Sequence, residues 1–311
     1  MPERNQSMLF SVVIPTYNRA EKVLCTIQSV LLQAKTHRVE IIVVDDGSTD
    51  NTREQLSSLI SSGSIHYVAH NGNLGVCAAR NTGIAHATGE LLLFLDSDDN
   101  LLLGALDYIA LHFDHCPETD ILFGGTVTFE NIPMCSVEDS PARLDFKQIL
   151  EGGAKGEFFA ICRPRVFDKF RFDETLNGFE GITWLQIARD GYILIYDEHY
   201  LRSGEFCDDG LSGYVALTGN PMRFAKGYLA QLNALGAHIR ESFSNIYDEW
   251  VLKSILYHRL AGKDVRGIIQ SYPAMHRSTQ LYILCVRLLP VMLLRLLFNL
   301  KVRIQVQRRR W

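Results

Sequence analysis

The feature that most constrains the fold is an alternation of short apolar runs and helical patterns through the first third of the chain. The apolar runs have the length of strands buried on both faces, and the intervening stretches carry apolar residues at helical spacing. Buried strands separated by helices are typical of a parallel sheet inside an α/β sandwich. The sequence therefore predicts an α/β fold with a mostly parallel sheet. The expected strands are 10–15, 39–44, 64–69 and 91–95, and the expected helices are 20–33, 51–61 and 75–87.

The pattern loosens beyond residue 100 but continues the sandwich, and only helical patterns remain from about residue 220. We therefore expect an α/β domain over 1–219 and a helical C-terminal region over 220–311. The elements expected between them are a helix over 101–115, a strand over 120–129, an irregular surface loop over 131–145, a strand over 156–163, a helix over 180–190 and a strand over 192–196.

Charge is distributed unevenly along the chain. The net charge is −4, but the last acidic residue is Asp264, and nine basic residues follow it. Residues 1–264 therefore carry a net charge of −13 and the remainder +9. An acidic body argues against nucleic acid as a partner, whereas a basic tail suits an anionic surface. The seven cysteines include no CxxC pair and follow no evident secretion signal, so we expect a reducing cytoplasm rather than disulfides or a zinc cluster.

Polar and acidic residues follow three of the expected strands, at 15–18, 45–48 and 96–99. The carboxyl ends of parallel strands meet at one edge of a sheet, where ligands bind. Clustered carboxylates repel one another unless a cation or hydrogen-bond donors lie among them, and Mg²⁺ often binds through one or two carboxylates plus substrate phosphates. Asp96 and Asp98 therefore form a candidate metal site. An Asp-Ser-Asp turn that only caps its own backbone is the alternative.

Four motifs occur in one order along the chain: VIPTYNR at 13–19, EIIVVDDGSTD at 40–50, NLG followed by ARNTG within 73–83, and GELLLFLDSDD at 89–99. Together they resemble the family 2 glycosyltransferases, which have the GT-A fold. The resemblance is strong up to residue 103 and continues weakly to about residue 215. It implies a nucleotide-sugar half over about 10–103 and an acceptor half over about 104–219.

The resemblance also implies roles for the residues that precede the second helix. Pro15, Thr16 and Tyr17 would border the nucleotide base, and the tyrosine ring could stack on it. Asp45 and Asp46 would include the carboxylate that reads the base imide, which favours uracil and hence a UDP-sugar donor.

The remaining donor-site roles fall on the later motifs. Gly75 and Arg80 would face the nucleotide or brace the acidic turn. Asp96 and Ser97 would lie near the ribose or the donor sugar. Asp98, with Asp96 beside it, would bind the Mn²⁺ or Mg²⁺ that bridges the diphosphate. A nucleoside diphosphate leaves readily only when its developing charge is neutralised.

Inverting transfer needs a carboxylate to take the proton of the acceptor hydroxyl. Members of the family carry an acidic pair at a helix start about 80 residues after the metal turn. Glu180 occupies the first position of this pair, but Gly181 replaces the usual aspartate. We expect Glu180 to be the catalytic base, with Asp173 or Glu174 as alternatives. The acidic pair at 208–209 could touch the acceptor or the metal, or form a solvated turn.

The C-terminal segment approaches the length of a membrane span, but residues 281–300 contain two arginines and a proline. Central arginines are costly in a span. The polar residues lie on one arc of a helix, so we expect an amphipathic helix over about 278–304 lying in the membrane interface, with 308–311 as a basic and aromatic anchor. Burial against the catalytic domain or in a dimer is the alternative.

These expectations combine into an inverting, metal-dependent glycosyltransferase that acts peripherally on the cytoplasmic side of the cell membrane. Its donor would be a UDP-sugar and its acceptor a lipid-linked or related glycan of surface polysaccharide or glycolipid synthesis. Two alternatives stay open. One is a nucleotidyltransferase of related fold, although the first strand is followed by no glycine-rich basic loop. The other is a degenerate sugar-nucleotide-binding or scaffold protein, which Gly181 keeps open.

Overall fold

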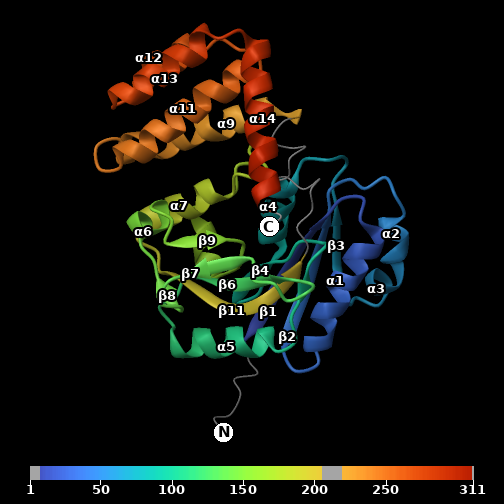
Figure 1. Cartoon of the computed structure of the whole chain (residues 1–311). Helices are drawn as coiled ribbons and strands as arrows, with labels where there is room; N and C mark the ends of the chain where they lie inside the picture. Colours follow the sequence, from blue (N-terminus) through green and yellow to red (C-terminus); the bar gives the residue numbers. More distant parts are fainter. Residues whose placement is uncertain (1–7, 205–218, 310–311) are drawn as a thin grey trace. The chain divides into compact units, whose positions relative to one another are not determined.

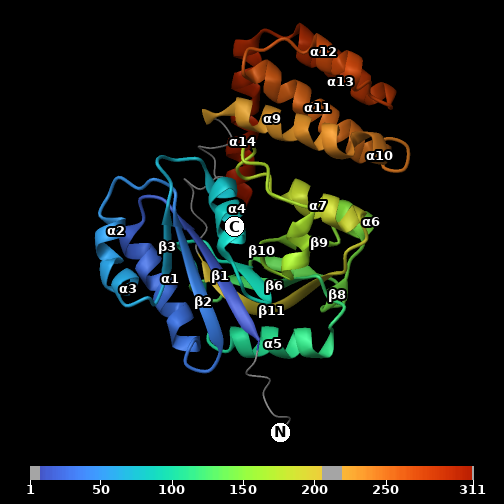
Figure 2. The same cartoon turned by 180° about the vertical axis from the view of Figure 1, so that it is seen from behind.

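The computed structural model describes residues 8–204 and 219–309. For residues 302–309 it describes only the backbone. The chain forms two compact units, residues 1–205 and 206–311. Figures 1 and 2 show a sheet flanked by helices in the first unit and helices in the second.

The first unit contains a nine-stranded sheet within the described residues. One half is parallel and consists of β1 (Leu9–Thr16), β2 (Arg38–Asp45), β3 (His66–Ala69) and β4 (Leu91–Phe94). β1 lies between β2 and β4, and β3 is at the edge. The predicted α/β class with a largely parallel sheet is confirmed.

The other half of the sheet is mixed in direction. β10 (Phe158–Cys162) lies between β4 and β6 (Ile121–Thr128) and is antiparallel to both. β11 (Leu194–Gly204), the longest strand of the sheet, is parallel to β6. Two-residue strands complete this edge, and a separate two-stranded sheet lies nearby. The two-residue strands are β5 (Asn100–Leu101) and β8 (Ala142–Arg143), and in the separate sheet β7 (Cys135–Val137) pairs with β9 (Ala154–Gly156).

Helices cover both faces of the sheet because the buried strands present apolar side chains to both sides. On one face Val12 packs with residues of α1 and α5, and on the other Val13 packs with residues of α4 and α7. The first layer contains α1 (Ala20–Gln33), α2 (Thr52–Gln55), α3 (Ser57–Ser61) and α5 (Ala105–His115). The second contains α4 (Val76–His86), α6 (Phe146–Leu150), the 3-10 helix η1 (Pro164–Asp168) and α7 (Gly181–Arg189).

Two local expectations for this unit are corrected. The single helix expected over 51–61 is two short helices, α2 and α3, which meet at Leu56. Leu56 is fully buried against the sheet, so packing sets the direction of the chain there. The surface loop expected over 131–145 contains strands β7 and β8, whose hydrogen-bond partners are distant in sequence and leave no local pattern.

Glu40 on β2 links the amino-terminal parts of three neighbouring strands, β2, β1 and β4. Its carboxylate accepts hydrogen bonds from the Ser11 hydroxyl, from the Thr88 backbone N–H at 2.6 Å and hydroxyl at 2.9 Å, and from the Gly89 N–H at 3.0 Å. Burial alone would raise the pKa of Glu40, but these donors outweigh burial and hold it below its usual value. The charged carboxylate is therefore the form that stabilises the sheet.

We expect Glu40→Gln to lower the free energy of unfolding by about 1–2 kcal/mol at pH 7, because a charged acceptor of several hydrogen bonds is replaced by a neutral one. The folded-state pKa of Glu40 is depressed, so its stabilisation is complete above the unfolded-state pKa and is lost as the pH falls through the folded-state pKa. Urea unfolding at pH 7 and at pH 3 should show the difference between variant and wild type shrinking at acid pH. Glu21→Gln on α1 is the control, and a pH-independent difference would contradict this role.

The second unit is helical in its described part. Its helices are α9 (Pro221–Gln231), the π-helix η2 (Leu232–Gly236), α10 (Ala237–Ile239), α11 (Ser244–Leu260), α12 (Arg266–Ser271), α13 (Arg277–Leu288) and α14 (Val291–Arg309). Asn220 caps α9 by accepting from the Arg223 N–H at 3.2 Å. A small apolar core of Ala225, Tyr257, Leu260 and Leu294 joins α9, α11 and α14.

The prediction of one continuous helix over 278–304 is wrong, because the segment forms two helices separated at Leu289 and Pro290. Leu289 is extended, with φ −68° and ψ 137°, as the residue before a proline prefers. Arg295 is one of the two arginines within 281–300, on the arc of polar residues. It donates two hydrogen bonds to the Leu260 carbonyl, at 3.0 and 2.7 Å, and so caps the end of α11. In the described parts of the chain, no helix is both long enough and apolar enough to span a membrane.

Candidate functional site

The carboxyl ends of β1, β2 and β4 lie side by side and collect three of the four motifs. Thr16 pairs with Asp45 in the ladder between β1 and β2, and the Asp46 N–H donates to the Thr16 carbonyl at 2.8 Å. Val13 pairs with Phe94, so Asp96 emerges beside the end of β1. The predicted convergence of polar residues at one sheet edge is therefore present in the fold.

The end of β1 offers both an apolar and a polar surface. Pro15 is buried, and the Tyr17 side chain is 40% exposed beside it. The Thr16 hydroxyl is buried and has no hydrogen-bond partner among the described residues. Asp45 is buried and accepts from the Ser48 N–H at 2.8 Å and from a tyrosine hydroxyl of β3.

Asp46 organises the loop that follows β3. Its carboxylate accepts from His70 Nδ1 at 2.7 Å, from the Leu74 N–H at 2.9 Å and from the Gly75 N–H at 2.7 Å. His70 in turn contacts the Thr82 hydroxyl at 2.9 Å. Of the two aspartates in this motif, Asp46 has both carboxylate oxygens engaged by this loop, so it holds the start of α4 against the end of β2.

Gly75 permits the close approach of a distant segment. Its φ is +100°, and a Cβ there would lie 2.2 Å from the Asn177 side chain. Asn177 accepts from the Cys77 N–H at 3.0 Å, and Asn81 bonds the backbone of Phe172 through both its oxygen and its nitrogen. Segment 172–180 is thereby fastened to α4, which brings the predicted base to the strand ends.

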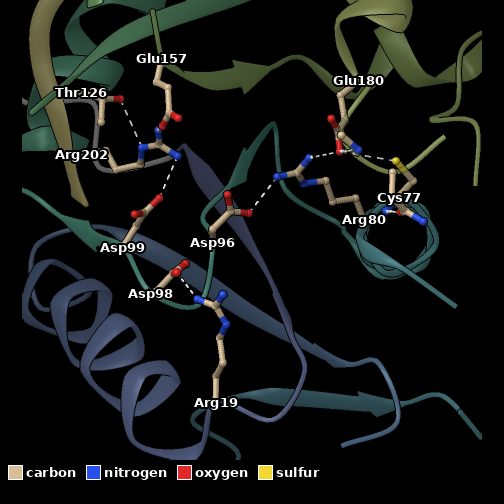
Figure 3. A network of polar contacts seen from close by, with 12 residues as sticks. Arg19, Cys77, Arg80, Asp96, Asp98, Asp99, Thr126, Glu157, Glu180 and Arg202 are labelled. Carbon is tan, nitrogen blue, oxygen red and sulfur yellow. Dashed lines mark hydrogen bonds and ion pairs between the residues drawn. The ribbon is translucent and has the colours of Figure 1, made fainter. Parts of the chain in front are cut away.

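Arg80 on α4 connects the acidic turn to the predicted base (Figure 3). Its guanidinium lies 2.8 Å from Asp96 Oδ1 and 3.3 Å from Glu180 Oε1, with 15% of the side chain exposed. Burial alone would raise the pKa of Asp96, but the charge of Arg80, followed by those of Arg202 and Arg19, holds it below its usual value. Asp96 is therefore ionised in this setting.

Glu180 is held mainly through one carboxylate oxygen. Besides Arg80, its Oε1 accepts from the Gly178 N–H at 3.2 Å and from the Cys77 thiol at 3.6 Å. Burial, reinforced by the charge of Glu180, raises the pKa of the Cys77 thiol to about 12. The thiol therefore keeps its proton at neutral pH, donates a hydrogen bond to Glu180 and is not a nucleophile.

The neighbours of Glu180 bear on the alternatives for the base. A Cβ at Gly181 would meet nothing within 4 Å, so the missing aspartate leaves open space. Asp173 accepts from the Thr175 N–H at 2.9 Å and hydroxyl at 2.7 Å, as a turn residue does. Glu174 accepts from Asn81 at 3.0 Å. The acidic pair at 208–209 lies outside the described residues.

Two further arginines pair with the acidic turn, and neither pairing was predicted from the sequence. Arg19 forms an ion pair with Asp98. Arg202 on β11 lies 2.8 Å from Asp99 and 3.3 Å from Glu157, as Figure 3 shows. Burial raises the pKa of Asp99 to about 7, although the charge of Arg202 opposes this shift. Arg19 is the last residue of the first motif and could have been found, whereas nothing in the sequence around Arg202 points to Asp99.

The acidic turn suits a divalent cation only together with a ligand. Within residues 8–204 and 219–301, whose side chains are described, no group of three or more His, Cys, Asp or Glu could hold a metal ion. Asp96 and Asp98 nevertheless come from one turn, and each already neutralises a guanidinium, so the position accommodates positive charge. Mg²⁺ sites commonly combine one or two carboxylates with substrate phosphates. Asp96 and Asp98 fit a cation whose remaining ligands are the oxygens of a bound diphosphate. Ser97, between these two aspartates in the sequence, is buried.

Comparison with known proteins adds independent information. The family model for glycosyl transferase family 2 matches residues 11–164. A Bacillus subtilis protein named for teichuronic acid biosynthesis, the glycosyltransferase TuaG, is 42% identical over 193 residues, which cover 60% of this chain and 75% of TuaG. The Escherichia coli UDP-Glc:alpha-D-GlcNAc-diphosphoundecaprenol beta-1,3-glucosyltransferase WfgD is 24% identical over 240 residues, covering 77% of this chain and 90% of WfgD.

Among solved structures, S. aureus TarS 1–349 in complex with UDP-GlcNAc has a similar fold. The TM-score is 0.61 at 20% sequence identity, and the match covers 90% of this chain and 79% of that one. This likeness shows the GT-A type of sheet and helices.

Proposed function

The chain belongs to glycosyltransferase family 2, and from that premise we propose that it transfers a sugar from a UDP-sugar, with inversion, to a lipid-linked glycan of a surface polysaccharide. The observation that carries this proposal is the Arg80 bridge, which joins Asp96 of the strand-end turn to Glu180. It unites a carboxylate suited to the donor side with one suited to deprotonating an acceptor. The UDP donor and the diphosphoundecaprenol acceptor named for WfgD support the same choice.

On the donor side, the end of β1 would receive the base. The exposed face of Tyr17 can stack on a pyrimidine. The Thr16 hydroxyl, which has no partner among the residues that the structure describes, can form a hydrogen bond with the same base. Asp45 is the carboxylate closest to this position in the ladder and would read the imide of uracil. Asp46 would act indirectly by holding the loop to Gly75.

The diphosphate would lie over the acidic turn. Mn²⁺ or Mg²⁺ bound by Asp98 and Asp96 would neutralise the charge that develops on the leaving diphosphate. Arg80 keeps Asp96 ionised and oriented for this task, since their contact is 2.8 Å.

Glu180 would take the proton of the acceptor hydroxyl as that oxygen attacks the anomeric carbon. The new bond forms on the face opposite the leaving UDP, the bond from that carbon to the diphosphate oxygen breaks, and the proton passes to Glu180. Arg80 and the Gly178 N–H hold Oε1. The second oxygen, Oε2, is then the one directed to the acceptor.

The acceptor proposal includes a membrane contact. In their described part, α13 and α14 expose nine large apolar side chains, here called the apolar face: Leu281, Tyr282, Leu284, Leu288, Met292, Leu293, Leu296, Leu297 and Leu300. No acidic residue follows Asp264, while nine basic residues do. Apolar area combined with positive charge suits the surface of an anionic bilayer. We therefore place the enzyme peripherally on the cytoplasmic leaflet.

Replacing Leu288 and Met292 together with glutamine should weaken binding to anionic vesicles about ten-fold or more. Their side chains are 75% and 86% exposed, so the protein should stay folded, and burial of each apolar side chain contributes about 1.5–3 kcal/mol. Co-sedimentation with phosphatidylglycerol vesicles measures the loss. Leu103→Gln in the first unit, 87% exposed, is the matched control. Equal binding by the double variant and the control would remove the apolar face from the proposal.

The direct test of the proposed reaction is a screen of UDP-sugars with Mn²⁺ against GlcNAc-diphosphoundecaprenol and related acceptors. We expect transfer from one UDP-sugar and a product whose anomeric configuration, read by NMR, is inverted. A product with retained configuration would contradict the mechanism. UDP binding without transfer or donor hydrolysis would instead favour the degenerate binding protein.

A further inference from the structure

Arg19 is held in place by the loops around it. Its neighbour Asn18 has a left-handed backbone, with φ +51°, and the Asn18 side chain accepts from the Thr49 N–H at 2.7 Å. The Asn18 N–H donates to the Ser48 hydroxyl at 2.9 Å. Arg19, the N-cap residue of α1, therefore lies beside the second motif, and its guanidinium reaches Asp98 on the fourth.

The Arg19–Asp98 pair differs from the other two pairs of the acidic turn. The side chains of Arg80 and Arg202 are only 15% and 8% exposed. Withdrawing Arg80 would leave Glu180, 18% exposed, without its compensating charge, and withdrawing Arg202 would do the same to Asp99, 12% exposed, which is unfavourable. The Arg19 and Asp98 side chains are 38% and 24% exposed. A solvated pair of this kind is weak, so it is the one that can open at little cost.

Asp98 cannot bind Arg19 and a divalent cation at full strength at the same time, because the two positive charges would lie close together at one carboxylate and repel each other. When the cation arrives with a nucleoside diphosphate, the guanidinium gains an alternative partner in the phosphate oxygens, which arginine binds well. We propose that Arg19 occupies Asp98 in the donor-free enzyme and transfers to the donor diphosphate when the cation takes Asp98. This inference rests on the proposed function, and it makes Arg19 a positioning residue for the metal and a binding residue for the donor.

The exchange predicts effects of opposite sign for one substitution. In Arg19→Gln, Asp98 has lost its competing cation, so Mn²⁺ alone should bind about two- to five-fold more tightly. UDP in the presence of saturating Mn²⁺ should bind about ten-fold more weakly, because a charge-assisted contact to phosphate is lost. A purely structural role for Arg19 would not strengthen binding of any ligand.

The experiment titrates Mn²⁺ into donor-free protein, followed by electron paramagnetic resonance of the free ion, and then titrates UDP calorimetrically at saturating Mn²⁺. Arg165→Gln is the matched control, because Arg165 pairs with Asp120 at 2.7 Å. The Arg165–Asp120 pair lies near the amino end of β4, because Cys162, three residues before Arg165, pairs with Leu92. The acidic turn follows the opposite, carboxyl end of β4. Arg19→Lys, which keeps the charge, should restore most of the UDP affinity.

The outcomes separate this inference from the function on which it rests. If Asp98→Asn abolishes Mn²⁺ binding but Arg19→Gln binds Mn²⁺ no more tightly than wild type, the Arg19 exchange is overturned and the metal site stands. If Asp98→Asn binds Mn²⁺ as well as wild type does, the metal site fails and the exchange fails with it. The exchange would be supported if Arg19→Gln, but not the Arg165→Gln control, bound Mn²⁺ more tightly and UDP more weakly than wild type.

Discussion

Replacing Glu180 with glutamine is expected to lower kcat about 10²–10⁴-fold, the usual contribution of a general base. Glutamine retains an oxygen that can accept from Arg80 and from the Gly178 N–H, so the segment should keep its position. UDP affinity should therefore stay near that of wild type. Initial rates with the cognate UDP-sugar and lipid-linked acceptor give kcat, and calorimetry gives the UDP affinity.

Glu174→Gln is the matched control for this substitution. Glu174 lies on the same segment, and its contact is to Asn81 at 3.0 Å rather than to Arg80. We expect its kcat to change less than about ten-fold, because it lacks a link to the acidic turn. The reverse pattern, in which Glu174→Gln is inactive and Glu180→Gln is active, would move the base to Glu174.

Replacing Asp98 with asparagine should lower kcat/KM about 10²–10³-fold, as is typical when one electrostatic stabiliser of the leaving charge is removed. The amide cannot neutralise a cation, so the residual activity should depend little on Mn²⁺. Chelation of divalent cations should reduce the wild type to a similar level, and added Mn²⁺ should restore only the wild type.

The control for Asp98 is Asp107→Asn on α5, which removes the same charge from a 48% exposed side chain that contacts His37. This variant should retain wild-type kcat/KM and its metal dependence. Full activity of Asp98→Asn, or equal loss in both variants, would show that Asp98 does not hold the catalytic cation.

Much of the first unit could be predicted because its signals are local. The strands before Pro15, Asp45 and Asp96 are apolar runs, and α1 and α4 have helical spacing, so each segment favours its own structure. The polar residues after these strands then had to meet, since parallel strands end at one edge. The second unit was less predictable, although Pro290 was visible. Whether a proline bends a helix or ends it depends on what surrounds it, and here Arg259 bonds the carbonyls of Arg287 and Leu289 at the break, at 3.3 and 3.1 Å.

The amino-acid sequence by itself determined the α/β sandwich, the strand-end turn of Asp96 and Asp98, and the family. Only the tertiary structure decided how charges pair within the site. Arg80 joins Asp96 to Glu180, and Arg19 meets Asp98. The reason is physical: hydrophobic periodicity is a local property that each segment carries, whereas an ion pair depends on the positions of side chains contributed by segments far apart in the chain, which exist only once the sheet and its helices have packed.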